Sequence, residues 1–95
     1  MDNTLKGKII KTEMSRNGLP YSSTYTITVD TIEGKIDVII VDTEINLFKM
    51  FGIVFKGEEC KLPDYDGRQC TIFKAGHRYF FNGFVEPTSS LATCY

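Results

Sequence analysis

The order of the expected secondary-structure elements is the feature that most restricts the fold of this chain. Strand-like segments come first, at residues 5–14, 21–29 and 35–42. A short helix-like segment follows at 44–51, and further strand-like segments fill most of the rest of the 95 residues. This order predicts a mainly β protein, a barrel or roll of five to six strands with one short helix between the third and fourth strands. We expect one domain, residues 1–95, with its core in residues 5–86 and a loose tail at 87–95.

The second strand-like segment shows the cleanest alternation in the chain. Tyr25, Ile27 and Val29 fall on one face. The opposite face carries only hydroxyl side chains, namely Ser22, Thr24, Thr26 and Thr28. Such alternation is typical of a strand with one buried face. The third segment contains four consecutive β-branched residues, 38–41, which predict a central strand buried on both faces.

A glycine inside the first segment predicts its shape. Gly7 interrupts a run of strand-forming residues, and a glycine in such a place indicates a bulge or a sharp bend. Small barrels need this bend, because their long first strand must serve both sides of the barrel. The next residues, 15–20, contain Asn-Gly and predict a turn into the second strand.

The helix-like segment has recognisable ends. Asp42 or Thr43 can cap its first turn, and Gly52 can end it in the left-handed conformation. Apolar residues, among them Phe48 and Phe51, cover much of its circumference. We therefore expect this helix to close one end of the barrel rather than lie on its surface.

The chain contains no motif of a catalytic, metal or cofactor site. It has no glycine-rich phosphate loop and no GxSxG sequence, and Cys60, Cys70 and Cys94 lack the paired spacing of a zinc site. His77 is the only histidine, and it is expected to be a solvated turn residue. We predict a protein that is not an enzyme and holds no metal or cofactor. Cys60 and Cys70 are expected as free thiols, with a disulfide or redox pair between them as the alternative.

Cysteine content and apolar runs also predict a location. An odd number of cysteines without paired spacing favours a reducing compartment. The first residues lack the charged and apolar regions of a secretory signal, and the longest apolar run, 38–41, is too short to span a membrane. These features predict a cytoplasmic protein that does not insert into membranes.

Basic and aromatic residues form the most suggestive group for function. The formal net charge of −1 argues against tight, sequence-independent binding to duplex DNA but leaves room for a local basic groove. The candidate residues are Lys6, Lys8, Lys11, Arg16, Tyr21, Tyr25, Lys74, His77, Arg78 and Tyr79. If the barrel brings them to one groove, the cations would follow the phosphates of a single-stranded nucleic acid and the rings would stack on its bases. The competing interpretation places the rings in the core and the cations on solvated strand faces.

An acidic loop supports a different function. Its carboxylates could contact a basic partner protein or could simply be the solvated side chains of a turn. They are Glu58, Glu59, Asp64 and Asp66. The alternative to nucleic-acid binding is therefore a small protein–protein interaction module, an inhibitor of a partner protein or a self-associating protein.

The element order also resembles the OB-fold, a five-stranded Greek-key barrel with a helix between its third and fourth strands. The resemblance is carried by the bent first strand with Gly7, the segments 21–29, 38–41 and 44–51, and a final hairpin at 71–85. It implies ligand binding on the face of strands two and three, near the first turn and the last hairpin, at Ser22, Thr24, Thr26, Thr28, Arg16 and residues 74–78. Two features depart from that pattern: residues 53–69 are long enough to hold an extra strand, and the chain lacks a basic excess. An SH3-like barrel is the alternative architecture.

Overall fold

The computed structural model describes residues 3–16, 22–57 and 59–85. The elements in chain order are β1 (Thr4–Arg16), β2 (Ser23–Thr31), β3 (Gly34–Asp42), α1 (Glu44–Phe51), β4 (Val54–Lys56), β5 (Glu59–Lys61), β6 (Gln69–Ala75) and β7 (Arg78–Phe84). The protein is thus mainly β, with one short helix between the third and fourth strands, as predicted. The expected turn at 17–20 and the expected tail at 87–95 lie outside the described residues.

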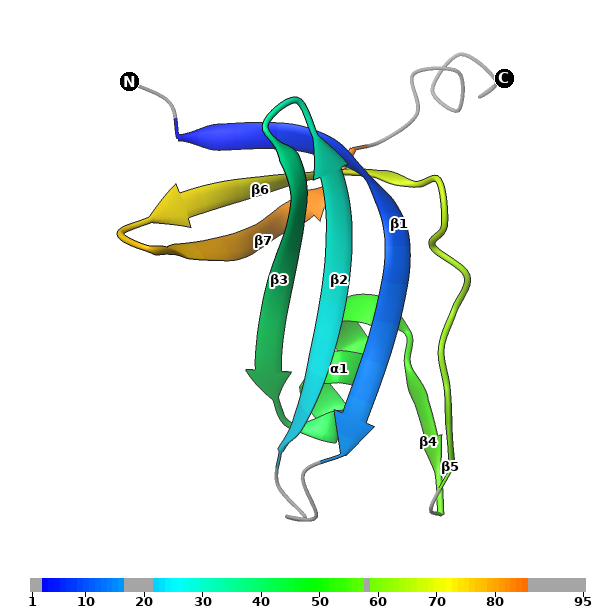
Figure 1. The fold of residues 1–95 in the computed structure, drawn as a ribbon. Coiled ribbons are helices and arrows are strands. Elements are labelled where there is room, and N and C mark those ends of the chain that lie inside the picture. The colour runs from blue at the N-terminus through cyan, green and yellow to red at the C-terminus, as the bar shows by residue number, and fades with distance from the viewer. Residues whose placement is uncertain (1–2, 17–21, 58, 86–95) are drawn as a thin grey trace, which may run out of the picture.

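One antiparallel sheet forms most of the molecule (Figure 1). Its strand order is β3-β2-β1-β6-β7, and β4 and β5 form a separate two-stranded hairpin. Residues 53–69, which the sequence indicated are long enough to hold an extra strand, contain the two short strands of this hairpin. The two ends of the sheet order, β3 and β7, lie close together in space, although no strand ladder joins them in the described ranges. The sheet is curled into a roll, and the described residues of its two end strands are not hydrogen-bonded to each other as in a closed barrel.

Strand β1 belongs to both halves of the curled sheet. Its first residues, 4–8, pair with β6, and residues 7–16 pair with β2. The ladder with β2 shifts register between Ile9 and Lys11, which makes Ile10 the bulged residue. The predicted bend is present, with the bulge three residues beyond Gly7.

Gly7 has a different role from that bulge. A Cβ atom at this position would lie 2.5 Å from Val29 Cγ1 and 2.8 Å from the Asp30 carbonyl oxygen. Both distances are shorter than real Cβ atoms adopt. The absence of a side chain at Gly7 therefore lets β2 approach β1 closely at the point where β1 also begins to pair with β6.

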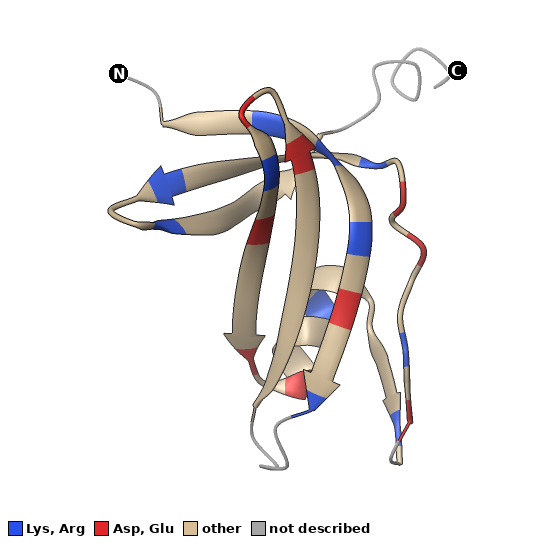
Figure 2. Ribbon diagram, viewed as in Figure 1, with Lys and Arg blue, Asp and Glu red and all other residues tan. Residues whose placement is uncertain are grey.

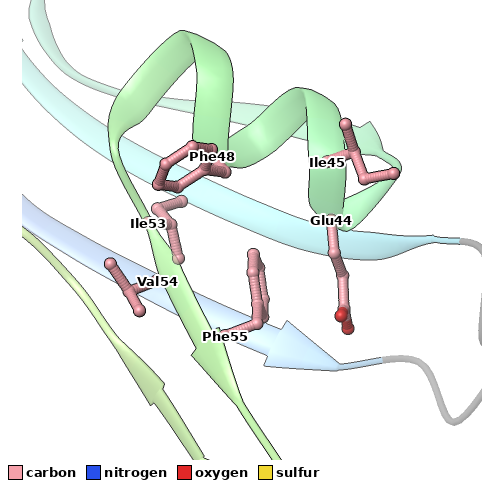
Figure 3. A pocket seen from close by; sticks show the side chains of 6 residues that line it. All are labelled: Glu44, Ile45, Phe48, Ile53, Val54 and Phe55. Atoms are coloured by element: carbon pink, nitrogen blue, oxygen red, sulfur yellow. The ribbon is translucent and has the colours of Figure 1, made fainter.

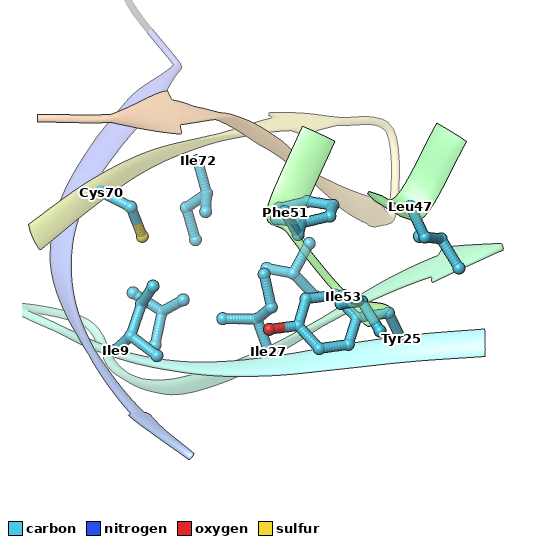
Figure 4. Packing of buried hydrophobic residues seen from close by; sticks show 10 residues of the cluster. Ile9, Tyr25, Ile27, Leu47, Phe51, Ile53, Cys70 and Ile72 are labelled. Carbon is cyan, nitrogen blue, oxygen red and sulfur yellow. The ribbon is translucent and has the colours of Figure 1, made fainter. Parts of the chain in front are cut away.

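The core lies inside the roll and is closed by α1 (Figure 4). Its fully or almost fully buried side chains are Ile9, Tyr25, Ile27, Val29, Val38, Leu47, Phe51, Ile53, Cys70 and Ile72. The Phe51 ring lies 5.0 Å from the ring of Tyr25 and 5.2 Å from that of Phe81, measured between centroids. Burial of such a ring typically contributes several kcal/mol, about 3–5 when replaced by alanine.

The ends of α1 follow the sequence signals. The Thr43 hydroxyl accepts a hydrogen bond from the Asn46 backbone N–H, and Gly52 adopts a φ of 74° while its N–H donates to the Phe48 carbonyl. Leu47 and Phe51 turn into the core. Ile45 and Phe48 stay exposed, so the helix closes the roll with one face and presents an apolar second face to solvent.

The prediction that residues 38–41 form a central, doubly buried strand is wrong. β3 is an end strand of the sheet, and Ile39 and Val41 are 55% and 59% exposed, while Val38 is buried. β-Branched residues favour strands on either face of a sheet, so a run of them indicates a strand without indicating what covers it. Ile39 and Val41 are therefore exposed apolar side chains at the end of the sheet that lies near β7.

Strand β7 does not alternate regularly along its whole length. Residues 80 and 84 would share a face in a regular strand, but the ladder between β6 and β7 shifts register at Thr71 and Ile72. Phe84 therefore points inward, with its ring 5.1 Å from that of Phe81, while Phe80 stays outside. Gly83, with a φ of 137°, supplies the backbone conformation for this shift.

Candidate nucleic-acid interface

The two halves of the sheet carry different charges (Figure 2). We call residues 4–8 of β1 together with β6 and β7 the cationic half-sheet, and residues 9–16 of β1 with β2 and β3 the mixed half-sheet. The charged residues of the cationic half-sheet are Lys6, Lys8, Lys74 and Arg78, and it contains no Asp or Glu. Those of the mixed half-sheet are Lys11, Arg16, Lys35, Glu13, Asp30, Asp37 and Asp42. Carboxylates therefore lie among the cations on one half only, and at the junction Asp30 of the mixed half-sheet lies opposite Lys8.

A stacked pair of phenylalanines lies on the outer face of the cationic half-sheet. Phe73 and Phe80 are direct cross-strand partners, and their ring centroids are 5.3 Å apart with an interplanar angle of 23°. They alternate with the inward-facing Ile72 and Phe81, and they remain 36% and 38% exposed. Flat rings that keep this much solvent contact are available to stack on another planar group.

Cations surround this pair. The Arg78 guanidinium lies 5.6 Å from the centre of the Phe80 ring. Lys6 and Lys8 share the outer face of β1 with Thr4, the cross-strand partner of Phe73, because the inner positions of that strand belong to Leu5 and Ile9. Three of the predicted cations, Lys6, Lys8 and Arg78, therefore lie on the same face as the exposed rings.

The tip of the β6–β7 hairpin brings the other predicted residues together. Lys74 lies across from Tyr79, with its Nζ atom 5.8 Å from the ring centre, and His77 is exposed in the turn. Tyr79 is half-buried and packs against the core. Lys74, His77, Arg78 and Tyr79 thus form one cluster, as the sequence suggested.

A groove runs between this hairpin and the edge of β3. One hollow of about 280 Å³ is lined by Ile39, Val41 and Met50 on one side and by Arg78 and Phe80 on the other. A second hollow of about 220 Å³ lies beside it, lined by Asp37, Ile39, His77, Arg78 and Tyr79. The exposed end of β3 is therefore continuous with the basic and aromatic hairpin.

Arg16 has a structural role at the opposite end of β1, which corrects its assignment to the ligand groove. Its Nε and Nη2 atoms donate to Glu44 Oε2 at 3.1 and 2.8 Å, and its Nη1 atom donates to the Gly57 carbonyl at 2.7 Å. Its guanidinium also lies 5.5 Å from the centre of the Phe55 ring. Arg16 therefore ties β1 to the start of α1 and to the β4–β5 hairpin.

Lys11 and the predicted tyrosines of β2 also fall outside the hairpin cluster. Lys11 forms a 2.8 Å ion pair with Glu13 on the mixed half-sheet, and its hydrogen bond to that carboxylate raises the pKa of the lysine. Tyr25 is fully buried, so its assignment to an exposed stacking surface is wrong. Tyr21 lies outside the described residues.

Burial controls the ionisation of Tyr25 and Cys70. It raises the pKa of Tyr25 to about 12 and raises the pKa of the Cys70 thiol. Thr12 lies close enough to lower the pKa of Tyr25 slightly, but the phenol oxygen has no hydrogen-bond partner of good geometry among the described residues. Cys60 and Cys70 are free thiols.

The acidic loop lies apart from the basic hairpin. Asp64, Asp66 and Glu59 are exposed, and Asp64 Oδ1 accepts a hydrogen bond from the Asp66 backbone N–H at 3.1 Å, which closes the turn. Glu58 lies outside the described residues. Within the described ranges, no group of three or more His, Cys, Asp or Glu side chains could hold a metal ion, and no helix is long and apolar enough to cross a membrane.

The exposed face of α1 forms a second apolar groove with β4 (Figure 3). This hollow of about 330 Å³ is lined by Glu44, Ile45, Phe48, Ile53, Val54 and Phe55. Ile45, Phe48 and Val54 are 67%, 56% and 45% exposed. Several large apolar side chains exposed together usually indicate a contact surface.

The signal that could have identified Phe73 and Phe80 from the sequence was weak. Both residues alternate with apolar neighbours, and only the strand register shows that they face each other across the hairpin and outward. No protein-family model, curated protein or solved structure matches this chain. The geometry of the surface is therefore the basis for assigning a function.

Proposed function

We propose that this protein is a non-catalytic module that binds single-stranded nucleic acid on the outer face of its cationic half-sheet. The observation that carries the proposal is the exposed Phe73–Phe80 stack on a half-sheet whose only charged side chains are cations. Proteins that bind single strands combine these two features, because rings accept the faces of unpaired bases and cations neutralise phosphates.

Stacking explains why a single strand suits this surface better than a duplex. The faces of paired bases are covered by their neighbours in a duplex, whereas an unpaired base can lie on Phe80 or Phe73. Each such base–ring contact is typically worth about 1–3 kcal/mol. Lys6, Lys8 and Arg78 share the outer face with the rings, and we expect them to neutralise the phosphates of a strand bound there.

The net charge of the chain is compatible with this proposal. The total is −1, but the carboxylates of the sheet all belong to the mixed half-sheet. Fields around exposed charges fall off over a Debye length of about 8 Å in physiological salt, so a ligand responds mainly to the charges near it. The resemblance to the OB-fold stays a prediction and favours the same kind of ligand.

The test is fluorescence anisotropy of a labelled single-stranded oligonucleotide at low and moderate salt. Replacing Phe80 by alanine should raise Kd about tenfold, because one stacking contact is lost. Phe48→Ala is the matched control: it removes the same side chain from an exposed site, 56% accessible, on α1. Absence of binding at low salt, or equal effects of the two substitutions, would refute the proposal.

The α1–β4 groove favours a second function, binding of a partner protein. Three exposed apolar side chains offer much less than the roughly 800 Å² that each partner contributes to a standard interface, so a short apolar peptide fits better than a folded domain. In this case Phe48→Ala would abolish peptide capture and Phe80→Ala would not. Selection from a random peptide library followed by titration with both variants separates the two functions.

A further inference from the structure

We infer that the hollow between β3 and the tip of the β6–β7 hairpin recognises one base of the bound strand and prefers the amino bases cytosine and adenine over thymine and uracil. This inference rests on the proposed function, because the hollow adjoins the Phe73–Phe80 stack. Arg78 connects the two places: it lines the hollow and its guanidinium also lies 5.6 Å from the centre of the Phe80 ring.

The size of the hollow suits a single planar group. Its volume of about 220 Å³ is below the roughly 300–1,000 Å³ of pockets for drug-sized ligands. Ile39 and Tyr79 supply apolar surface, while Asp37, His77 and Arg78 supply polar groups. A base leaving the stack on Phe80 would find both kinds of contact there.

Asp37 is held in position by a hydrogen bond from the neighbouring strand β2. Its Oδ1 atom accepts a 2.7 Å hydrogen bond from Thr28 Oγ1, its cross-strand partner on β2. Lys11, the next residue in that cross-strand row, is attracted by the charge of Asp37, but its ion pair, at 2.8 Å, is with Glu13. In the described part of the chain, the second carboxylate oxygen of Asp37 therefore stays available as an acceptor at the hollow.

The chemistry of this pair of groups selects among bases. A carboxylate only accepts hydrogen bonds and a guanidinium only donates them, so Asp37 and Arg78 together match a base edge with an amino group beside a ring acceptor. Cytosine and adenine have that edge. Thymine and uracil present carbonyl oxygens on both sides of their single N–H, and a carboxylate repels those oxygens.

The experiment compares labelled dC and dT oligonucleotides of about 15 nucleotides, a length within reach of such sites, by anisotropy in mildly alkaline buffer. The unmodified protein should bind dC about tenfold more tightly than dT. Asp37→Asn should reduce this ratio to about one, because the amide can donate to a carbonyl as readily as it accepts, and it keeps the acceptor for Thr28.

Asp30→Asn is the matched control. It changes the net charge by the same amount on an exposed residue of β2 that does not line the hollow, so it should strengthen binding of both oligonucleotides and keep their ratio. Equal binding of dC and dT by the unmodified protein, or a ratio that survives Asp37→Asn, overturns the inference and leaves the proposed function standing. Failure of both oligonucleotides to bind overturns the proposed function itself.

Discussion

The cationic and mixed half-sheets share β1 but treat their charges in opposite ways. On the mixed half-sheet, charged and polar groups pair within the protein: Lys11 with Glu13, and Thr28 with Asp37. On the cationic half-sheet, Lys6 lies opposite Thr71 and two positions from Thr4, the partner of the exposed Phe73, and Arg78 lies over Phe80. Lys8, at the junction, lies opposite Asp30 of the mixed half-sheet. A surface whose charges are paired within the protein contributes solubility, whereas a surface that carries cations and exposed rings is suited to an external anionic ligand.

The substitution with the largest expected effect on stability lies at the junction of the two half-sheets. Gly7→Ala would place a methyl group within 3 Å of Val29 and of the Asp30 carbonyl, so β1 could no longer pair with both neighbours. We expect a loss of about 2–3 kcal/mol in the free energy of unfolding. Denaturant titration measures it.

Ser15→Ala on the exposed end of β1 is the control for this substitution. Its effect should stay within about 0.5 kcal/mol, as for other surface changes. If Gly7→Ala proved equally mild, the close approach of β2 at Gly7 would not determine how the halves join.

Ionisation of Tyr25, in the core beneath the mixed half-sheet, should lower the free energy of unfolding at high pH. Its pKa is raised from 10.0 to about 12, so folding favours the neutral phenol; this stability is complete below pH 10 and is lost as the pH rises toward 12. The loss should reach about 2 kcal/mol. Unfolding titrations at several alkaline pH values measure it.

Tyr25→Phe separates this effect from other alkaline changes. The substitution should remove the extra loss above pH 10 and leave stability at neutral pH unchanged or slightly higher, since the hydroxyl has no well-formed hydrogen bond. Tyr79→Phe, at a half-buried tyrosine of the cationic half-sheet, should keep the alkaline loss. An unchanged alkaline loss in Tyr25→Phe would assign it to another group.

Arg16 tests whether the far end of the mixed half-sheet holds the β4–β5 hairpin. Arg16→Gln removes the bonds to Glu44 and Gly57, and we expect a loss of about 1–2 kcal/mol, limited because both charged side chains are about 30% exposed. Hydrogen exchange should accelerate in β4 and β5 first. Lys11→Gln, which breaks only an exposed pair, should leave those amides protected.

The smallest expected effects are those of single cations on nucleic-acid binding, and they test directly which half-sheet holds the ligand. Lys6→Gln and Lys8→Gln should each reduce the slope of log K against log salt by about 0.7, the value for one phosphate contact with a single strand. Lys35→Gln on the mixed half-sheet changes the net charge equally and should leave the slope unchanged. Equal slopes for all three variants would place the ligand somewhere other than the cationic half-sheet.

Local signals predicted the elements well because each depends on a few neighbouring residues. The alternation in β2, the cap at Thr43, the left-handed Gly52 and the bend near Gly7 are all properties of short sequence windows. The grouping of Lys74, His77, Arg78 and Tyr79 was also predictable, since one tight turn brings them together. The roles of Tyr25, Arg16 and the run 38–41 were not, because each depends on which element covers that side chain.

Propensity, alternation and glycine positions act over a few residues, so the amino-acid sequence was enough to predict a mainly β chain with one capped helix. Which residues meet depends on the packing of segments that are distant in the chain. The register shift in β7 sent Phe84 inward and left Phe80 outside, facing Phe73, and the curl of the sheet brought β3 beside the hairpin. Contacts between strands distant in sequence depend on registers and bulges that the whole fold fixes together, so the exposed rings and their cations became a surface only when the sheet closed around its core.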